Sequence, residues 1–79
     1  MSLREPTDQQ ILEFFAREGR NNAINAAADL GINRPFVSVR LTILAQNDYL
    51  ERVGPAPNSG LYELTDTGNQ LLNCENQAH

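Results

Sequence analysis

The sequence predicts an α+β domain in which three helices are followed by a two-stranded hairpin and a last helix. Two observations predict this order. Apolar residues recur at helical spacing over the first half of the chain, and after Asn47 and Asp48 they recur in two short strand-like stretches. At 79 residues there is room for one domain with one modest core. We expect a flexible leader over residues 1–6, the domain over 7–73 and a tail over 74–79.

The first helix is expected from about residue 8 to 18. Thr7 is suited to cap it, and Asp8 in the first turn suits the positive end of the helix dipole. Gly19 is expected to end it. An apolar stripe would face the core, made of Ile11, Leu12, Phe15 and Phe14.

The second and third helices are predicted to be joined by a tight turn. Asn22 is suited to cap a helix from about 23 to 30, which would carry Ala26, Ala27 and Leu30 inward. Gly31 can take the left-handed conformation that such a junction needs.

Asn33 is then suited to cap the third helix, which should run to about Gln46. Pro35 falls in its first turn, where the missing N–H costs little. One face of this helix carries the apolar residues Val37, Leu41 and Leu44.

Residues 49–53 and 61–64 are predicted to form two short strands of a hairpin. The segment 54–60 between them consists mainly of turn-forming residues and is too long for a two-residue turn. Thr65 is suited to cap a last helix that starts near Asp66 and carries Leu71 and Leu72.

Ala27, Gly31 and Val37 have the spacing of a helix-turn-helix, and the hairpin follows as a wing would. With these features the sequence resembles the winged helix-turn-helix regulators of the MarR-like superfamily. The resemblance covers about residues 7 to 72. It looks closest to small repressor-like domains of haloarchaea and their viruses, on the stretches 30–38 and 49–54.

The resemblance implies a transcription regulator, most simply a repressor, that binds double-stranded DNA as a homodimer. The dimer contacts would come from the first and last helices. The third helix, about 34–46, would read the major groove, where base edges display a distinct pattern of donors and acceptors.

Candidate contact residues follow from the face of the third helix that points away from the core. The far side is expected to carry Pro35, Val39, Thr42 and Gln46. The flanks near the N-terminal end would carry Arg34, Phe36 and Ser38. Arg34 would contact guanine or phosphate, Ser38 and Thr42 would contact bases or phosphate, and Val39 would lie against a thymine methyl group.

The remaining contact candidates lie outside this face or leave two interpretations open. Asn22, at the start of the second helix, suits a phosphate. Arg52, with Asn58 and Ser59 of the wing, suits the DNA backbone or minor groove. Arg40 is a further candidate for DNA contact, although it can equally be a solvated charge or pair with an acid of a neighbouring helix.

The charge of the chain is unusual for a DNA-binding protein. Ten acids outweigh six arginines, there is no lysine, and the net charge is −4. Between Arg20 and Gly60, however, the sequence contains four arginines and only three acidic residues. An acidic, lysine-free composition is typical of proteins from saline cytoplasm. With three or four arginines at the DNA a monomer would bind weakly, which favours a dimer on a two-fold operator.

Two other functions remain open. The domain can be a winged helix kept for protein docking, which exposed Phe36, Val39 and Ile43 would favour. Binding to single-stranded nucleic acid is disfavoured because no run of exposed aromatic residues offers a stacking platform. Aromatic and leucine residues elsewhere are expected in the core or at a dimer interface: Phe14, Phe15, Tyr62 and Leu71.

The sequence argues against several further functions. No nucleophile with its base and no glycine-rich phosphate loop is visible, so we expect no enzyme. Cys74 and His79 do not make a metal site, and Cys74 has no basic neighbour to activate it. We expect no cofactor, no small-molecule ligand, no membrane span and no signal peptide, and therefore a cytoplasmic protein.

Overall fold

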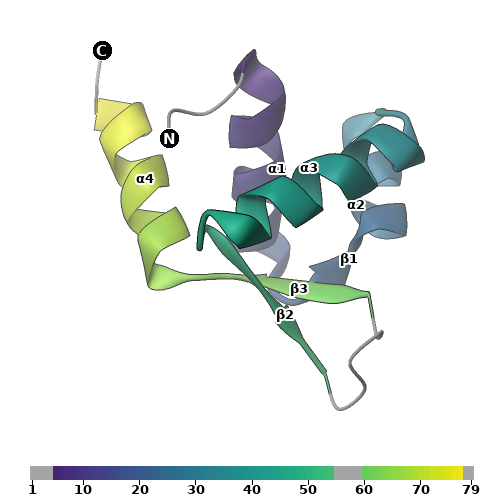
Figure 1. Cartoon of the computed structure of the whole chain (residues 1–79). Coiled ribbons are helices and arrows are strands. Elements are labelled where there is room, and N and C mark those ends of the chain that lie inside the picture. Colours follow the sequence, from purple (N-terminus) through teal and green to yellow (C-terminus); the bar gives the residue numbers. More distant parts are fainter. Residues whose placement is uncertain (1–4, 55–59, 78–79) are drawn as a thin grey trace.

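The computed structural model describes residues 5–54 and 60–77 and gives an α+β winged helix (Figure 1). The described part holds four helices and three strands. They are α1 (Glu5–Glu18), β1 (Asn21–Asn22), α2 (Ala23–Leu30), α3 (Arg34–Gln46), β2 (Leu50–Val53), β3 (Leu61–Leu64) and α4 (Asp66–Gln77).

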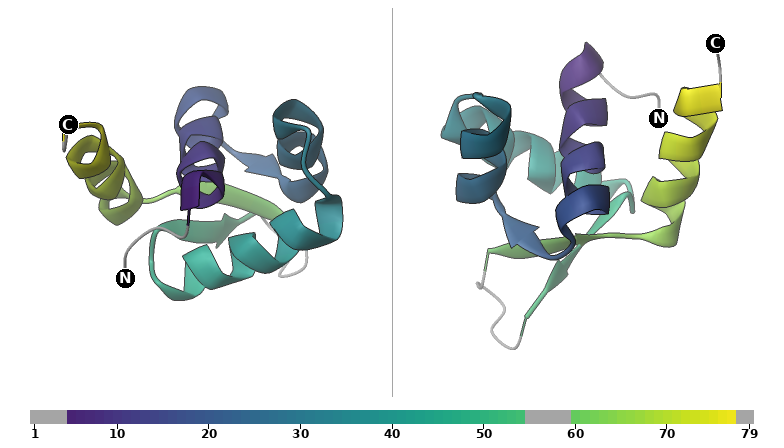
Figure 2. Two further views of the ribbon diagram at one scale, coloured as in Figure 1. Left: turned by 90° about the horizontal axis from the view of Figure 1, so that it is seen from above. Right: turned by 180° about the vertical axis from the view of Figure 1, so that it is seen from behind.

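Helix α1 is the centre of the helical layer, with α2 on one side and α4 on the other (Figure 2). Its apolar stripe is buried as predicted, and Gly19 ends it with φ 79° and an N–H that donates to the Phe15 carbonyl at 2.9 Å. The expectation for its start was wrong. The helix begins at Glu5, so Thr7 lies inside it and does not cap it.

The turn between α2 and α3 has the predicted local chemistry. The Asn22 side chain accepts a hydrogen bond from the Asn25 N–H, and the Asn33 side chain accepts one from the Phe36 N–H. Gly31 adopts the left-handed conformation with φ 66°. These caps fix where α2 and α3 begin, and Gly31 turns the chain between them.

The sheet has one strand more than the sequence predicts. Strand β3 is central, with β1 and β2 antiparallel on its two sides. Tyr62 is paired with Asn21 of β1 and with Arg52 of β2. With only two residues, both asparagine, β1 has no alternating apolar pattern that could reveal it.

The core lies where α1, α2 and α3 meet the sheet. The predicted inner face of α3, formed by Val37, Leu41 and Leu44, is fully buried. Thr65 caps α4, since its hydroxyl accepts a hydrogen bond from the Gly68 N–H at 3.0 Å. The hairpin β2–β3 projects away from the helices (Figure 1).

Candidate nucleic-acid interface

The outer face of α3 is open and carries no carboxylate. The helix packs against the core through Val37, Leu41 and Leu44, so its opposite side does not pack against the core. Pro35 and Val39 are exposed there and Thr42 is half-buried. The whole helix, from Arg34 to Gln46, contains two arginines and no acid. This face can therefore approach a polyanion without a like charge on the helix itself.

Arg40 does not belong to that face, which corrects its place among the expected DNA contacts. It is only 6% exposed, and its guanidinium holds the carboxylate of Asp8 with Nε–Oδ1 and Nη2–Oδ2 distances of 2.9 and 2.6 Å. These hydrogen bonds raise the pKa of Arg40 above its usual value. The alternative interpretation, pairing with an acid of a neighbouring helix, is confirmed.

The described arginines fall into two groups. Arg17, Arg20 and Arg40 each pair with one or more carboxylates. Arg34 and Arg52 have no carboxylate partner among the described residues. Arg34 begins α3, and Arg52 lies on β2 with its guanidinium carbon 5.8 Å from the centre of the Tyr62 ring. Arg34 and Arg52, the two described arginines without a carboxylate partner, therefore lie on the helix and the hairpin that the sequence predicts to face DNA.

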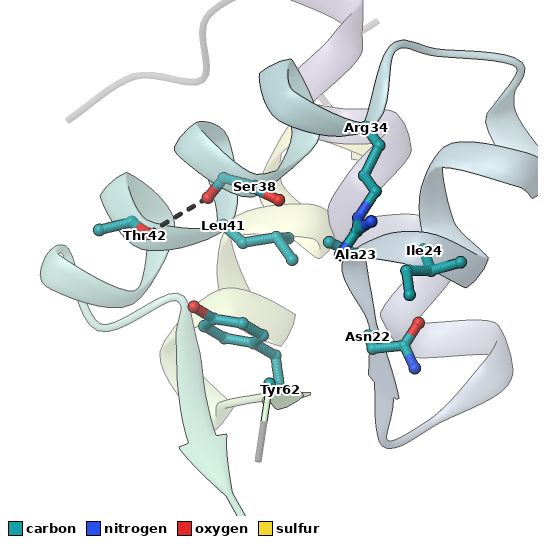
Figure 3. Close-up of a pocket in the computed structure, with 9 residues that line it drawn as sticks. Asn22, Ala23, Ile24, Arg34, Ser38, Leu41, Thr42 and Tyr62 are labelled. Atoms are coloured by element: carbon teal, nitrogen blue, oxygen red, sulfur yellow. Dashed lines mark hydrogen bonds between the residues drawn. The ribbon is translucent and has the colours of Figure 1, made fainter. Parts of the chain in front are cut away.

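A cavity of about 310 Å³ lies between the start of α2, the outer flank of α3 and β3 (Figure 3). It brings together four of the predicted contact residues, and none of the described residues that line it is acidic. Its lining is Asn22, Ala23, Ile24, Arg34, Ser38, Leu41, Thr42, Gly60 and Tyr62.

Two of the five polar side chains that line the cavity, Asn22 and Thr42, already make a local hydrogen bond. The Asn22 oxygen caps α2, and the Thr42 hydroxyl donates to the Ser38 carbonyl at 3.2 Å. The Arg34 side chain extends into the space between α3 and the start of α2 (Figure 3). Among the described residues, Arg34 is thus the one charged side chain that lines the cavity.

A second hollow, on the other side of Thr42, has a different character. It lies between the C-terminal half of α3 and β2, and its lining includes two acidic residues, Asp48 and Glu51, as well as Arg52. The negative charge of these two residues disfavours a phosphate at this end of α3. The N-terminal half of α3 is therefore the better surface for a polyanion.

The exposure of the apolar residues on this surface agrees only in part with the prediction from the sequence. Phe36 and Val39 are 42% and 56% exposed, as expected for either a DNA or a protein contact. Ile43 was expected to be exposed and is half-buried instead. Ile24, on the rim of the cavity, is exposed, which the sequence pattern did not indicate.

Sequence reasoning assigned Tyr62 to the core or a dimer interface and missed its place in the cavity wall. The residue is 8% exposed, so the core assignment is confirmed for its ring, but it also lines the cavity. The signal that could have revealed this position is the cross-strand pairing of Tyr62 with Arg52. That pairing can be found only once the register of the hairpin is known. The wing residues Asn58 and Ser59 lie outside the described residues.

Two general features bear on other functions. Among residues 5–54 and 60–77, no three His, Cys, Asp or Glu side chains are grouped so that they could hold a metal ion. In the same part of the chain, no helix combines the length and apolar character needed to cross a membrane.

No protein-family model and no curated protein matches the sequence. Among solved structures, the oxidized form of MarR from E. coli superposes with a TM-score of 0.79 at 20% identity, over 90% of this chain and 52% of that chain. A mutant MarR from E. coli complexed with operator DNA gives 0.73 at 18% identity, over 85% and 49%.

The Zalpha domain of Cyprinid Herpesvirus3 ORF112, studied for its binding to Z-DNA, gives a TM-score of 0.69 at 19% identity, over 80% of this chain and 98% of that chain. The chain thus spans about half the length of the MarR chains and nearly the whole Zalpha domain. At these identities the likeness concerns the fold. The chain has the winged-helix fold that DNA-binding proteins of the MarR and Zalpha kinds also have.

Proposed function

We propose that this protein is a sequence-specific double-stranded DNA-binding regulator of transcription, acting as a repressor. The observation that carries the proposal is the position of the two arginines without a carboxylate partner. Arg34 begins α3 and Arg52 lies on the hairpin, where a winged helix meets DNA. Cations that the fold leaves unneutralised can replace the counterions of a phosphate backbone.

In the proposed complex α3 enters the major groove with its exposed side toward the bases. Arg34 lies at the N-terminal end, from which it reaches guanine or a phosphate. Ser38 and Thr42 follow at intervals of four residues on the same flank. Val39, exposed on the outer face, suits the methyl group of a thymine. Arg52 would hold the backbone beside the hairpin.

We further propose a homodimer on a two-fold operator, joined through α1 and α4. Two unpaired arginines per protomer give a small electrostatic contribution to binding, and a second protomer doubles it. Light scattering during size-exclusion chromatography would measure the mass in solution and after addition of operator DNA. A complex with a single protomer on the DNA would contradict the proposed homodimer. It would not contradict the proposed contact between α3 and DNA.

The direct test is selection of duplexes from a random pool, at low and at high salt, followed by titration of the enriched sequence. We expect enrichment of one motif and weaker binding at high salt. The titration includes an alternating CG duplex held in the left-handed form, because one similar domain is known with Z-DNA. Equal, weak binding to every duplex would contradict sequence-specific recognition.

A second candidate function, docking of a protein partner, is favoured by one observation. Phe36 and Val39 leave large apolar side chains in solvent on α3. Paired variants separate the two functions: Arg34→Ala should weaken a DNA contact, whereas Phe36→Ala with Val39→Ala should weaken a protein contact. If only the apolar pair matters and no duplex binds, docking becomes the function.

A further inference from the structure

The cavity beside α3 contains a polar group that the fold does not use. Tyr62 is more than nine-tenths buried, and its hydroxyl has no hydrogen-bond partner among the described residues. The side chain points from β3 toward the turn of α3 that carries Leu41 and Thr42 (Figure 3). No buried side-chain oxygen or nitrogen of the described residues lacks a partner, so this hydroxyl is reached by the solvent that fills the cavity. It is therefore free to donate a hydrogen bond to an atom of a ligand bound there.

The other free groups around this hydroxyl also donate hydrogen bonds. The Arg34 guanidinium has only donors and no carboxylate partner among the described residues. Ala23 and Ile24 of the first turn of α2 line the cavity, and amides of a first turn have no partner within their own helix. The Asn22 oxygen, an acceptor, is occupied by the Asn25 N–H. A ligand suited to this cavity therefore offers several acceptors and a negative charge.

We propose that this cavity is a subsite for one backbone phosphate of the bound DNA, with the Tyr62 hydroxyl as one of its donors. The inference rests on the proposed function and names a contact that it does not include. A phosphodiester has two non-bridging oxygens that share one negative charge, and in the proposed subsite one accepts from Arg34 and the other from the hydroxyl. The cavity is larger than a lone oxyanion fills, and its apolar side, Leu41 and Ala23, suits the adjoining sugar.

Tyr62 also links the subsite to the second unpaired arginine. The Arg52 guanidinium lies over the Tyr62 ring, at 5.8 Å from its centre, while Arg34 lines the cavity that Tyr62 bounds. Tyr62 therefore lies next to one unpaired arginine through its ring and shares the cavity with the other. In the proposed subsite these two arginines supply local positive charge in a protein whose net charge is −4.

The test begins with Tyr62→Phe, which removes only the hydroxyl. We expect about tenfold weaker binding to the selected duplex, the low end for a hydrogen bond to a charged group. The melting temperature should stay unchanged because the hydroxyl has no partner in the described fold. The dependence of affinity on salt should also stay unchanged, since a neutral group is removed. Tyr49→Phe, outside the cavity, is the matched control.

A duplex with single neutral methylphosphonate linkages locates the phosphate. At one position the neutral linkage should weaken binding of the wild-type protein by about the same factor as Tyr62→Phe does. At that position the linkage should not weaken binding of the Tyr62→Phe variant any further. Independent, multiplying losses at every position would show that the hydroxyl contacts no phosphate and would overturn the subsite. Unchanged affinity of Tyr62→Phe would overturn it as well, while the proposed function would stand.

If no duplex binds, the proposed function fails and the cavity is tested separately. Inorganic phosphate is titrated against the protein and the amide shifts are compared with chloride at equal ionic strength. Saturable shifts at Ala23, Gly60 and Tyr62 that Tyr62→Phe abolishes would keep the anion site, with free phosphate as its source. Shifts that are absent, or equal with chloride, would overturn it.

Discussion

Arg34 and Arg40 belong to the same helix, six residues apart, and have opposite surroundings. Arg40 points inward, where the carboxylate of Asp8 neutralises it in the buried space between α1 and α3. Arg34 points into an open cavity with no acidic side chain. One arginine is part of the fold, and the other is available to a ligand.

The same contrast separates the two hollows beside α3. The hollow near Arg34 has no acid, and the hollow near Arg52 contains Asp48 and Glu51. Net charge therefore predicts little about binding here, because the position and pairing of each charge decide where an anion can approach. The three predictions that follow test this contrast between a structural and an available arginine.

The largest effect is expected from Asp8→Ala. Removing one partner leaves the Arg40 charge buried and unneutralised, which costs about 3–5 kcal/mol of the free energy of unfolding. For a domain of this size such a loss leaves little folded protein. Urea denaturation, monitored by circular dichroism, measures it.

A double variant separates the charge from the packing. Asp8→Leu with Arg40→Met replaces the pair by apolar side chains and should recover much of the missing stability. Asp29→Ala, which removes an exposed partner of Arg17, should change stability little. Equal losses for Asp8→Ala and Asp29→Ala would show that the buried pair does not hold the fold.

A smaller effect, on binding and not on stability, is expected from Arg34→Ala. If Arg34 contacts a base or a phosphate, the affinity for the selected duplex should fall by about 1–3 kcal/mol. Arg17→Ala, with an exposed and paired arginine on α1, is the control. Fluorescence anisotropy measures both. Equal affinities of the two variants would remove Arg34 from the interface.

The smallest effect is expected from neutralising the acidic hollow. Asp48→Asn and Glu51→Gln together should raise the affinity for the duplex by about two- to fivefold at low salt, and less at high salt. Asparagine suits position 48 because Asp48 has a left-handed backbone with φ 66°, which asparagine tolerates. A drop in affinity would mean that these carboxylates contact the DNA favourably.

The sequence predicted those parts of the fold that depend on contacts between near neighbours. The caps at Asn22, Asn33 and Thr65 use hydrogen bonds to residues three positions along the chain. The left-handed turn at Gly31 is likewise local. Such features leave a signature in a few adjacent residues, and each of these four predictions is confirmed.

The sequence did not predict the features that join distant segments. Asp8 and Arg40 are 32 residues apart, so their pairing depends on how α1 crosses α3. The two-residue strand β1 exists only because β3 lies beside it. Tyr62 lines the cavity because of its strand register. In each case tertiary packing supplies the information, and the candidate site is therefore less predictable than the elements that form it.

The most direct test of the central claim, that the unpaired arginines meet DNA, is the slope of log affinity against log salt concentration. The double variant Arg34→Ala with Arg52→Ala should lower the magnitude of this slope by about two per protomer, close to one for each phosphate that is no longer neutralised. Arg17→Ala with Arg20→Ala removes two paired arginines and should leave the slope near that of the wild type. The reverse ranking, or no change in either, would contradict the account.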